Sequence, residues 1–322
     1  LPQPVYQGVI ERDGHSLVLV NIAVLAAVLV LFQGVGGVLT AVTIGLEITD
    51  KNVQAFRLMQ SLAQYLFIAF PILFVTRLHT GDRSLFSVSN LDYLSLTAKP
   101  SSREILLAVL GVLVSYPLLS YLGNLQMILI ESLPMLNRAL EPLRPLKKIM
   151  EQLTAVNSFP EFVFLVFVVA ITPALCEELM FRGYVQKNFS RTLSVASTVG
   201  LTGVIFGLFH IDPFNTLPLI ALGIYMAFLR QTSESLWPSV AAHFANNFVS
   251  LVAIFILSHT KELGIGDKVA SELNSTKPDI SSPVAIVSAL VSAAVLFGVI
   301  GLYRSESSRR LARTPRAAMS TH

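Results

Sequence analysis

The chain has 322 residues, of which 53% are hydrophobic and only 13% are Asp, Glu, Lys or Arg. Soluble domains usually have about a quarter of their residues charged, so this composition excludes an ordinary soluble protein and indicates a polytopic membrane protein. The net charge of +3 is small, and no basic block interleaved with aromatic residues suggests nucleic-acid binding. The single cysteine, Cys176, excludes an internal disulfide framework and a zinc site with several cysteine ligands.

Eight apolar stretches predict helices that cross the bilayer, which takes about 20 residues each. In chain order they cover about residues 17–45, 58–75, 104–130, 162–178, 193–210, 216–229, 237–257 and 283–303. The first stretch is too long for a signal peptide and has no convincing cleavage site, so we expect it to remain as a spanning helix. The expected fold is an all-α, polytopic integral membrane bundle of about eight transmembrane helices.

Two further segments differ in composition from the apolar stretches. Prolines break any long helix within residues 131–161, but apolar residues then recur at helical spacing at Leu146, Ile149, Met150 and Leu153. This pattern predicts a short amphipathic helix at the membrane surface, either as a connector packed on the bundle or as a lid or docking element. The tail from Arg304 is polar and basic, with Arg309, Arg310, Arg313 and Arg316, and we expect it to be disordered.

The fourth stretch ends in a cluster of ionisable residues. Such groups are expensive at membrane depth, so they are either paired or functional. Glu178 and Arg182 are separated by four residues, which places them on one helix face where they can form an ion pair. Glu177 is rotated by about 100° from Glu178 and points elsewhere. This asymmetry suggests a supported acid–base residue rather than a plain salt bridge.

Polar residues also recur four positions apart in two later spans. His210 follows Phe206 by four residues, and Asn247 follows His243 by four. A carboxylate beside a neutral histidine can deprotonate a water molecule, and a second histidine with an amide can bind an oxyanion. The same Glu177, His210 and His243 side chains could instead bind zinc, although no His-Glu-x-x-His helix is present.

At these residues the chain resembles the CAAX protease and bacteriocin-processing family, which includes the Ras-converting CAAX endopeptidases and the bacterial Abi proteins. The resemblance covers about residues 160–257 and consists of three motifs in order: Glu177-Glu178-x-x-x-Arg182, Phe206-x-x-x-His210 and His243-x-x-x-Asn247. It implies a helical intramembrane glutamic endopeptidase that needs no metal and no cofactor. Each motif alone would be weak, but the three together are strong.

The resemblance also implies roles for the individual residues. Glu177 with His210 would activate the attacking water, and Glu178 with Arg182 would support and orient that pair. His243 and Asn247 would form the oxyanion hole. The implied partners are the lipid bilayer and a membrane-associated protein or peptide substrate, prenylated or not.

Purely structural roles remain open for several of these residues. Asn247 could simply hydrogen-bond between helices, a role for which Asn246 competes. Asp212 could either form a turn after His210 or orient that histidine. A Cys176 thiolate nucleophile is disfavoured, because the adjacent carboxylates oppose the thiolate and buried cysteines are usually inert.

Residues 1–322 are expected to form a single membrane domain. It divides into the first three spans with the amphipathic helix (1–159), the catalytic core with the three motifs (160–257), and the last span with the basic tail (258–322). Eight spans put both termini on one side, and the loops of that side carry more Lys and Arg, which predicts cytoplasmic termini. In a prokaryote the membrane would be the cell membrane. The alternatives to a glutamic peptidase are a metal-dependent membrane hydrolase and a non-catalytic scaffold or immunity-type protein.

Overall fold

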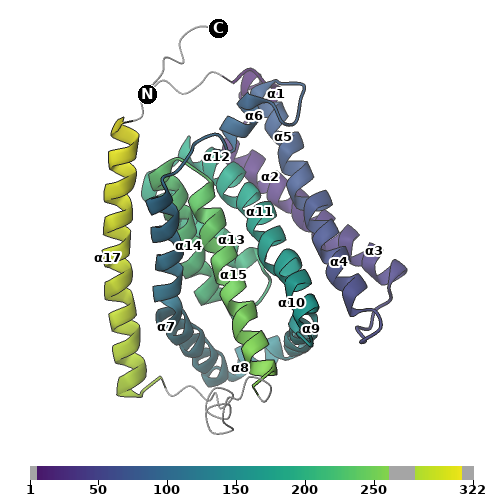
Figure 1. The fold of residues 1–322 in the computed structure, drawn as a ribbon. Coiled ribbons are helices and arrows are strands. Elements are labelled where there is room, and N and C mark those ends of the chain that lie inside the picture. The colour runs from purple at the N-terminus through teal and green to yellow at the C-terminus, as the bar shows by residue number, and fades with distance from the viewer. Residues whose placement is uncertain (1–5, 261–279, 314–322) are drawn as a thin grey trace.

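The computed structural model describes residues 6–260 and 280–313, and within these ranges the regular structure is entirely helical. Figure 1 shows a bundle of long helices, with α1 and the carboxyl end of α17 at the same end of the bundle. All eight predicted apolar stretches are helical, which confirms the all-α polytopic membrane fold. Between the seventh and eighth apolar stretches, residues 261–279 lie outside the described residues.

Six of the described helices are long and apolar enough to cross a membrane. They are α2–η1–α3 (Leu17–Thr43), α4–η2–α5 (Val53–Thr80), α7 (Ser102–Ser132), α10–η4–α11–η5–α12 (Phe159–Ser190), α15 (Trp237–Ser258) and α17 (Pro283–Arg313). The other two predicted spans are α13 (Val195–Phe209) and α14 (Thr216–Ser233), which pack along each other. At about 1.5 Å per residue, α13 is shorter than the hydrocarbon layer is thick.

Short helices cover the ends of the bundle. They are α1 (Val9–Arg12), α6 (Val88–Tyr93), α8 (Pro134–Leu140), the 3₁₀ turn η3 (Glu141–Leu143) and α9 (Arg144–Thr154). The predicted amphipathic helix corresponds to α9, and Leu146, Ile149 and Met150 on its apolar face are exposed. The buried Arg57 donates hydrogen bonds to the carbonyl oxygens of Leu153 and Ala155, at 2.8 and 2.6 Å, and so fixes the end of α9 to α4.

Within the described residues, four π-helical segments interrupt the long helices. They are η1 (Val30–Val35), η2 (Tyr65–Ala69), η4 (Val166–Ile171) and η5 (Leu179–Val185). Two of them, η4 and η5, flank α11 (Thr172–Glu178), the segment that ends in the two glutamates. Such π turns are rare and occur frequently at functional sites.

The predicted disorder of the basic tail is wrong for residues 304–313, which continue α17 as a regular helix. The reason is a buried contact with α7. Ser101 and Glu104 form a capping box at the start of α7, and the fully buried Glu104 carboxylate also accepts hydrogen bonds from Ser307 (2.6 Å) and Arg310 (2.7 Å). Satisfying a buried carboxylate in this way stabilises the last turns of α17. Arg316 lies outside the described residues.

A second polar network attaches the N-terminal segment to the bundle. Arg191 donates hydrogen bonds to both carboxylate oxygens of Glu11, at 2.6 and 2.8 Å, and the buried His79 lies between Glu11 and the Tyr184 hydroxyl, at 2.8 Å from each. Burial alone would raise the pKa of the Glu11 carboxyl, but the hydrogen bonds from Arg191 and His79 outweigh it and hold this pKa below its usual value. The network therefore fixes α1 against α5 and α12 (Gln186–Ser190).

Glycines allow α13 and α14 to approach backbone to backbone. A Cβ atom added at Gly203 would lie 2.5 Å from the backbone nitrogen of Ile224, and one added at Gly223 would lie 2.8 Å from the carbonyl oxygen of Gly203. Small residues bring helices this close in membrane proteins. The contact matters because α13 carries Phe206 and leads directly to His210.

We expect Gly203→Ala to lower the thermal unfolding midpoint of the protein in detergent, because the added methyl meets backbone atoms of α14 that cannot move away. Overpacking of this kind reduces the free energy of unfolding by about 1–3 kcal/mol. Gly200→Ala is the matched control on the same helix, since its Cβ would meet nothing within 4 Å. Equal midpoints for the two variants would contradict the close helix contact.

Candidate active site

The centre of the bundle contains a buried ionic cluster. Arg182 Nη1 donates a 2.6 Å hydrogen bond to Glu178 Oε1, which also lies 2.9 Å from His243 Nδ1. Arg182 Nη2 donates a 3.0 Å hydrogen bond to the carbonyl oxygen of Gly223. The side chains of Glu178 and Arg182 are completely buried and that of His243 almost so. The cluster thus joins the α11–η5 helix to α14 and α15.

The hydrogen bond to Glu178 determines that the Nδ1 atom of His243 carries a hydrogen. The Glu178 carboxylate, which is paired with Arg182, can only accept, so His243 Nδ1 must carry a hydrogen. The other nitrogen, Nε2, has no hydrogen-bond partner among the described residues. A neutral imidazole would present a lone pair at Nε2, whereas an imidazolium would present a second donor.

Glu177 and His210 form a separate pair. Glu177 Oε2 lies 3.7 Å from His210 Nε2, and the two side chains are 17% and 28% exposed. His210 Nδ1 lies 2.7 Å from the carbonyl oxygen of Phe206, which can only accept, so Nδ1 carries the hydrogen and a neutral His210 has its lone pair on Nε2. Glu177 Oε2 has no hydrogen-bond partner within the described part of the chain.

Two acceptors therefore face each other across a gap that is too long for a direct hydrogen bond. A water molecule can satisfy both, by donating one hydrogen to the Glu177 carboxylate and the other to His210 Nε2. Both side chains are partly exposed, whereas the Glu177 Oε2 atom itself is buried. A carboxylate and a neutral imidazole placed in this way can together polarise a bound water molecule.

The Phe206 ring organises the cationic and imidazole groups around it. The ring centroids of His210 and His243 lie 4.6 and 5.7 Å from that of Phe206, both in edge-to-face geometry. The Arg182 guanidinium carbon lies 4.2 Å from the same centroid, within the range of a cation–π interaction. One fully buried aromatic side chain thus contacts members of both polar groups and fixes their relative positions.

Asn247 lies one turn beyond His243 on α15 and is half-buried. Its Nδ2 donates to the carbonyl oxygen of Val169 (2.9 Å), and its Oδ1 accepts from Asn246 Nδ2 (3.1 Å). The backbone carbonyl of Asn246 in turn accepts a 2.9 Å hydrogen bond from the Tyr116 hydroxyl of α7. Asn246 therefore orients Asn247 rather than replacing it, and one N–H of the Asn247 amide remains for another acceptor.

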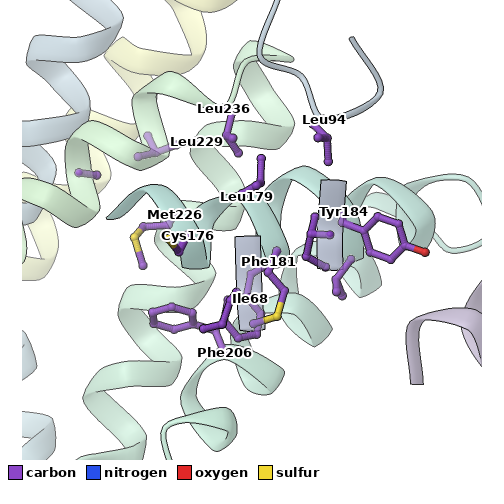
Figure 2. Close-up of a cluster of buried hydrophobic side chains, with 14 of the residues drawn as sticks. Ile68, Leu94, Cys176, Leu179, Phe181, Tyr184, Phe206, Met226, Leu229 and Leu236 are labelled. Carbon is purple, nitrogen blue, oxygen red and sulfur yellow. The ribbon is translucent and has the colours of Figure 1, made fainter. Parts of the chain in front are cut away.

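Cys176 and Asp212, the two other residues considered from the sequence, have structural roles. Cys176 is buried in a hydrophobic cluster that includes Phe181, Phe206 and Met226 (Figure 2). The Asp212 carboxylate accepts hydrogen bonds from the Phe214 backbone and the Asn215 side chain, at 3.0 and 2.7 Å, and so forms the turn after His210. Among the described residues, no group of three or more His, Cys, Asp or Glu side chains is arranged to hold a metal ion.

The six predicted site residues thus occupy one region of the bundle, grouped as the Glu178–Arg182–His243 cluster, the Glu177–His210 pair and Asn247. Sequence reasoning did not find the supporting groups. The Gly223 carbonyl comes from a helix without a motif, and Tyr116 comes from an apolar span where tyrosine is ordinary. Backbone acceptors and single tyrosines leave no pattern in a sequence, so only the packing identifies them.

The fold and this site define an integral membrane protein with an acid–base site within its helices, as expected of a membrane protease. Residues 159–249 match the family model described as Type II CAAX prenyl endopeptidase Rce1-like, and this segment contains all six residues. The match confirms the resemblance to the CAAX protease and bacteriocin-processing family over this part of the chain. Comparison with curated proteins and with solved structures gave no match.

Breaking the buried ion pair should strongly destabilise the protein. We expect Glu178→Gln to lower the free energy of unfolding by about 3–5 kcal/mol, because it leaves the Arg182 charge buried without its carboxylate. The double variant Glu178→Gln/Arg182→Met should regain part of this loss. Thermal unfolding in detergent measures both effects, with Glu177→Gln as a control because the Glu177 Oε2 atom has no hydrogen-bond partner among the residues that the structure describes. Equal midpoints for Glu178→Gln and Glu177→Gln would contradict this account.

Proposed function

We propose that the chain is an intramembrane endopeptidase that hydrolyses a peptide bond of a membrane-associated protein or peptide. The attacking group is a water molecule activated by Glu177 with His210. The observation that carries the proposal is the 3.7 Å separation of two acceptor atoms, Glu177 Oε2 and His210 Nε2, on partly exposed side chains. The family match supports the reaction class independently of this geometry.

In the proposed first step, the water oxygen attacks the scissile carbonyl carbon while Glu177 takes one of the water protons. The carbonyl π electrons move to the oxygen and give a tetrahedral oxyanion. In the second step the C–N bond breaks, the oxyanion collapses to a carboxylic acid product, and the proton held by Glu177 passes to the leaving amine. His210 accepts a hydrogen bond from the water and so keeps a lone pair of its oxygen directed at the substrate.

His243 and Asn247 are proposed to stabilise the oxyanion. Asn247 has one N–H that is not used by Val169. His243 can donate from Nε2 only as an imidazolium, because its Nδ1 hydrogen is already held by Glu178. In that form the buried cluster would supply a preorganised positive donor where negative charge develops.

This assigns Glu178 and Arg182 to positioning. Arg182 holds the Glu178 carboxylate at 2.6 Å and is itself fixed by the Gly223 carbonyl and the Phe206 ring. Glu178 then orients His243, while its neighbour Glu177 is left to face His210. A structural pair and a catalytic residue thus lie next to each other in the sequence.

The proposed substrate class is a protein or peptide with a prenylated cysteine near its carboxyl end, as the description of the matching family model indicates. Cytoplasmic termini are part of the same proposal. Basic residues gather at the end of the bundle where α1 lies, including Arg103, Arg191, Arg309 and Arg310, and positive charge is enriched in cytoplasmic loops.

We expect Glu177→Gln to reduce cleavage of a quenched prenylated CAAX peptide by roughly 10²–10⁴-fold, the usual contribution of a general base. The variant should fold normally, because within the described residues the lost charge has no ion-pair partner other than His210 at 3.7 Å. Cys176→Ala is the matched control at the adjacent position and should retain activity, since its side chain lies in the apolar cluster.

Each assay is repeated with a chelator and with an unprenylated peptide of the same sequence. Wild-type activity in Glu177→Gln would rule out the water-activation role. Loss of wild-type activity to the chelator, with recovery on adding zinc, would favour the metal-dependent hydrolase instead.

A further inference from the structure

A basic pocket lies between the start of α7 and the last turns of α17, apart from the candidate active site. Its volume is about 280 Å³, close to the lower limit of roughly 300 Å³ for small-molecule sites. It is lined by Ser101, Arg103, Glu306, Arg309, Arg310 and Arg313. Four arginines thus share the pocket with a single carboxylate.

Buried contacts hold the walls of the pocket in place. Arg310 Nε donates a 2.7 Å hydrogen bond to the buried Glu104 carboxylate, and its Nη2 donates to the carbonyl oxygen of Ser233. Glu306 accepts a 3.2 Å hydrogen bond from the Ser101 hydroxyl. The register of α17 against α7 is therefore fixed at the level of the pocket, and the pocket does not depend on flexible surface side chains alone.

The remaining three arginines are available for a ligand. Arg103, Arg309 and Arg313 are exposed and form no ion pair within residues 6–260 and 280–313. The positive end of the α7 helix dipole lies at the same place and adds to their field. Planar guanidinium groups bind phosphate oxygens in a bidentate manner, so the chemistry of the pocket is that of a phosphate site.

The depth of the pocket identifies the source of the phosphate. The apolar part of α17 runs from Pro283 to Tyr303, which at 1.5 Å per residue is about as long as the hydrocarbon layer is thick. Arg309 then lies roughly 9 Å beyond Tyr303 along the helix axis, in the headgroup layer. Immediately below the pocket, Leu106 of α7 and Leu302 of α17 are 66% and 61% exposed, so they can contact acyl chains.

We propose that this pocket binds the headgroup phosphate of an anionic glycerophospholipid, which lies with its chains along α7 and α17. The negative charge of the lipid phosphate balances the positive charges of Arg103, Arg309 and Arg313. The bound lipid also holds α17 against the bundle. This site is independent of the proposed peptidase activity. It also gives the helical part of the basic tail a role as a lipid-binding element.

The test compares two triple variants with the same change in net charge, using the full-length protein in a neutral detergent. The pocket variant is Arg103→Gln/Arg309→Gln/Arg313→Gln. The control variant is Arg12→Gln/Arg83→Gln/Arg138→Gln, in which the three replaced arginines are exposed and lie outside the pocket. Each protein is titrated with phosphatidylglycerol, phosphatidylcholine, inorganic phosphate and an acidic peptide, and the thermal unfolding midpoint is followed.

We expect phosphatidylglycerol to raise the midpoint of the wild type and of the control variant, with little effect of the zwitterionic lipid. In the pocket variant the apparent affinity should fall roughly 100-fold, since each basic residue near an anionic lipid surface contributes a factor of about five. Arg→Lys at the three pocket positions should restore part of the response. An equal response in both triple variants would overturn the proposal, and so would the same shift with inorganic phosphate alone. Binding of an acidic peptide without any phosphatidylglycerol effect would instead identify a protein partner.

Discussion

The Glu178–Arg182 ion pair is the interaction on which the rest of the site depends. Both groups are completely buried among apolar helices, where an isolated charge would be strongly unfavourable. His243 and the Gly223 carbonyl each make one further hydrogen bond to the pair, whereas Glu178 Oε2 and Arg182 Nε have no hydrogen-bond partner within the described residues. His243 and Gly223 come from α15 and α14, so the hydrogen bonds of one ion pair require three helices to pack together.

The same constraint leaves Glu177 in a different environment from its neighbour. Helical rotation turns Glu177 away from Arg182 and toward His210, whose ring orientation is set by the Phe206 carbonyl and the Phe206 ring. Glu177 is partly exposed and faces an acceptor, whereas Glu178 is buried and holds two donors. The two adjacent carboxylates therefore differ in burial and in hydrogen bonding, and such differences in environment are what give neighbouring carboxylates different acid–base properties.

Much of this arrangement could be predicted from the sequence, because helix formation and contacts between residues four positions apart depend on neighbouring residues. The apolar stretches predicted all eight helical segments, and the spacing of Glu178 and Arg182 predicted the contact that the two side chains make. Other features depend on contacts between residues distant in sequence. The helical end of α17 is stabilised by Glu104, about 200 positions away in the sequence. The Asp212 carboxylate accepts a hydrogen bond within the turn after His210, whereas the sequence also allowed it to orient that histidine. The π-helical segments on either side of α11 likewise depend on packing, and the spacing of apolar residues in the sequence does not predict them.

The central claim is that a water molecule attacks the substrate directly, without a covalent enzyme intermediate. The most direct measurement is a single turnover of a prenylated CAAX peptide in the presence of hydroxylamine, followed by mass spectrometry of both the products and the intact protein. The account predicts only the free carboxylate product and an enzyme of unchanged mass at every time point. A hydroxamate product, or an acylated enzyme with the adduct on Cys176, would contradict it.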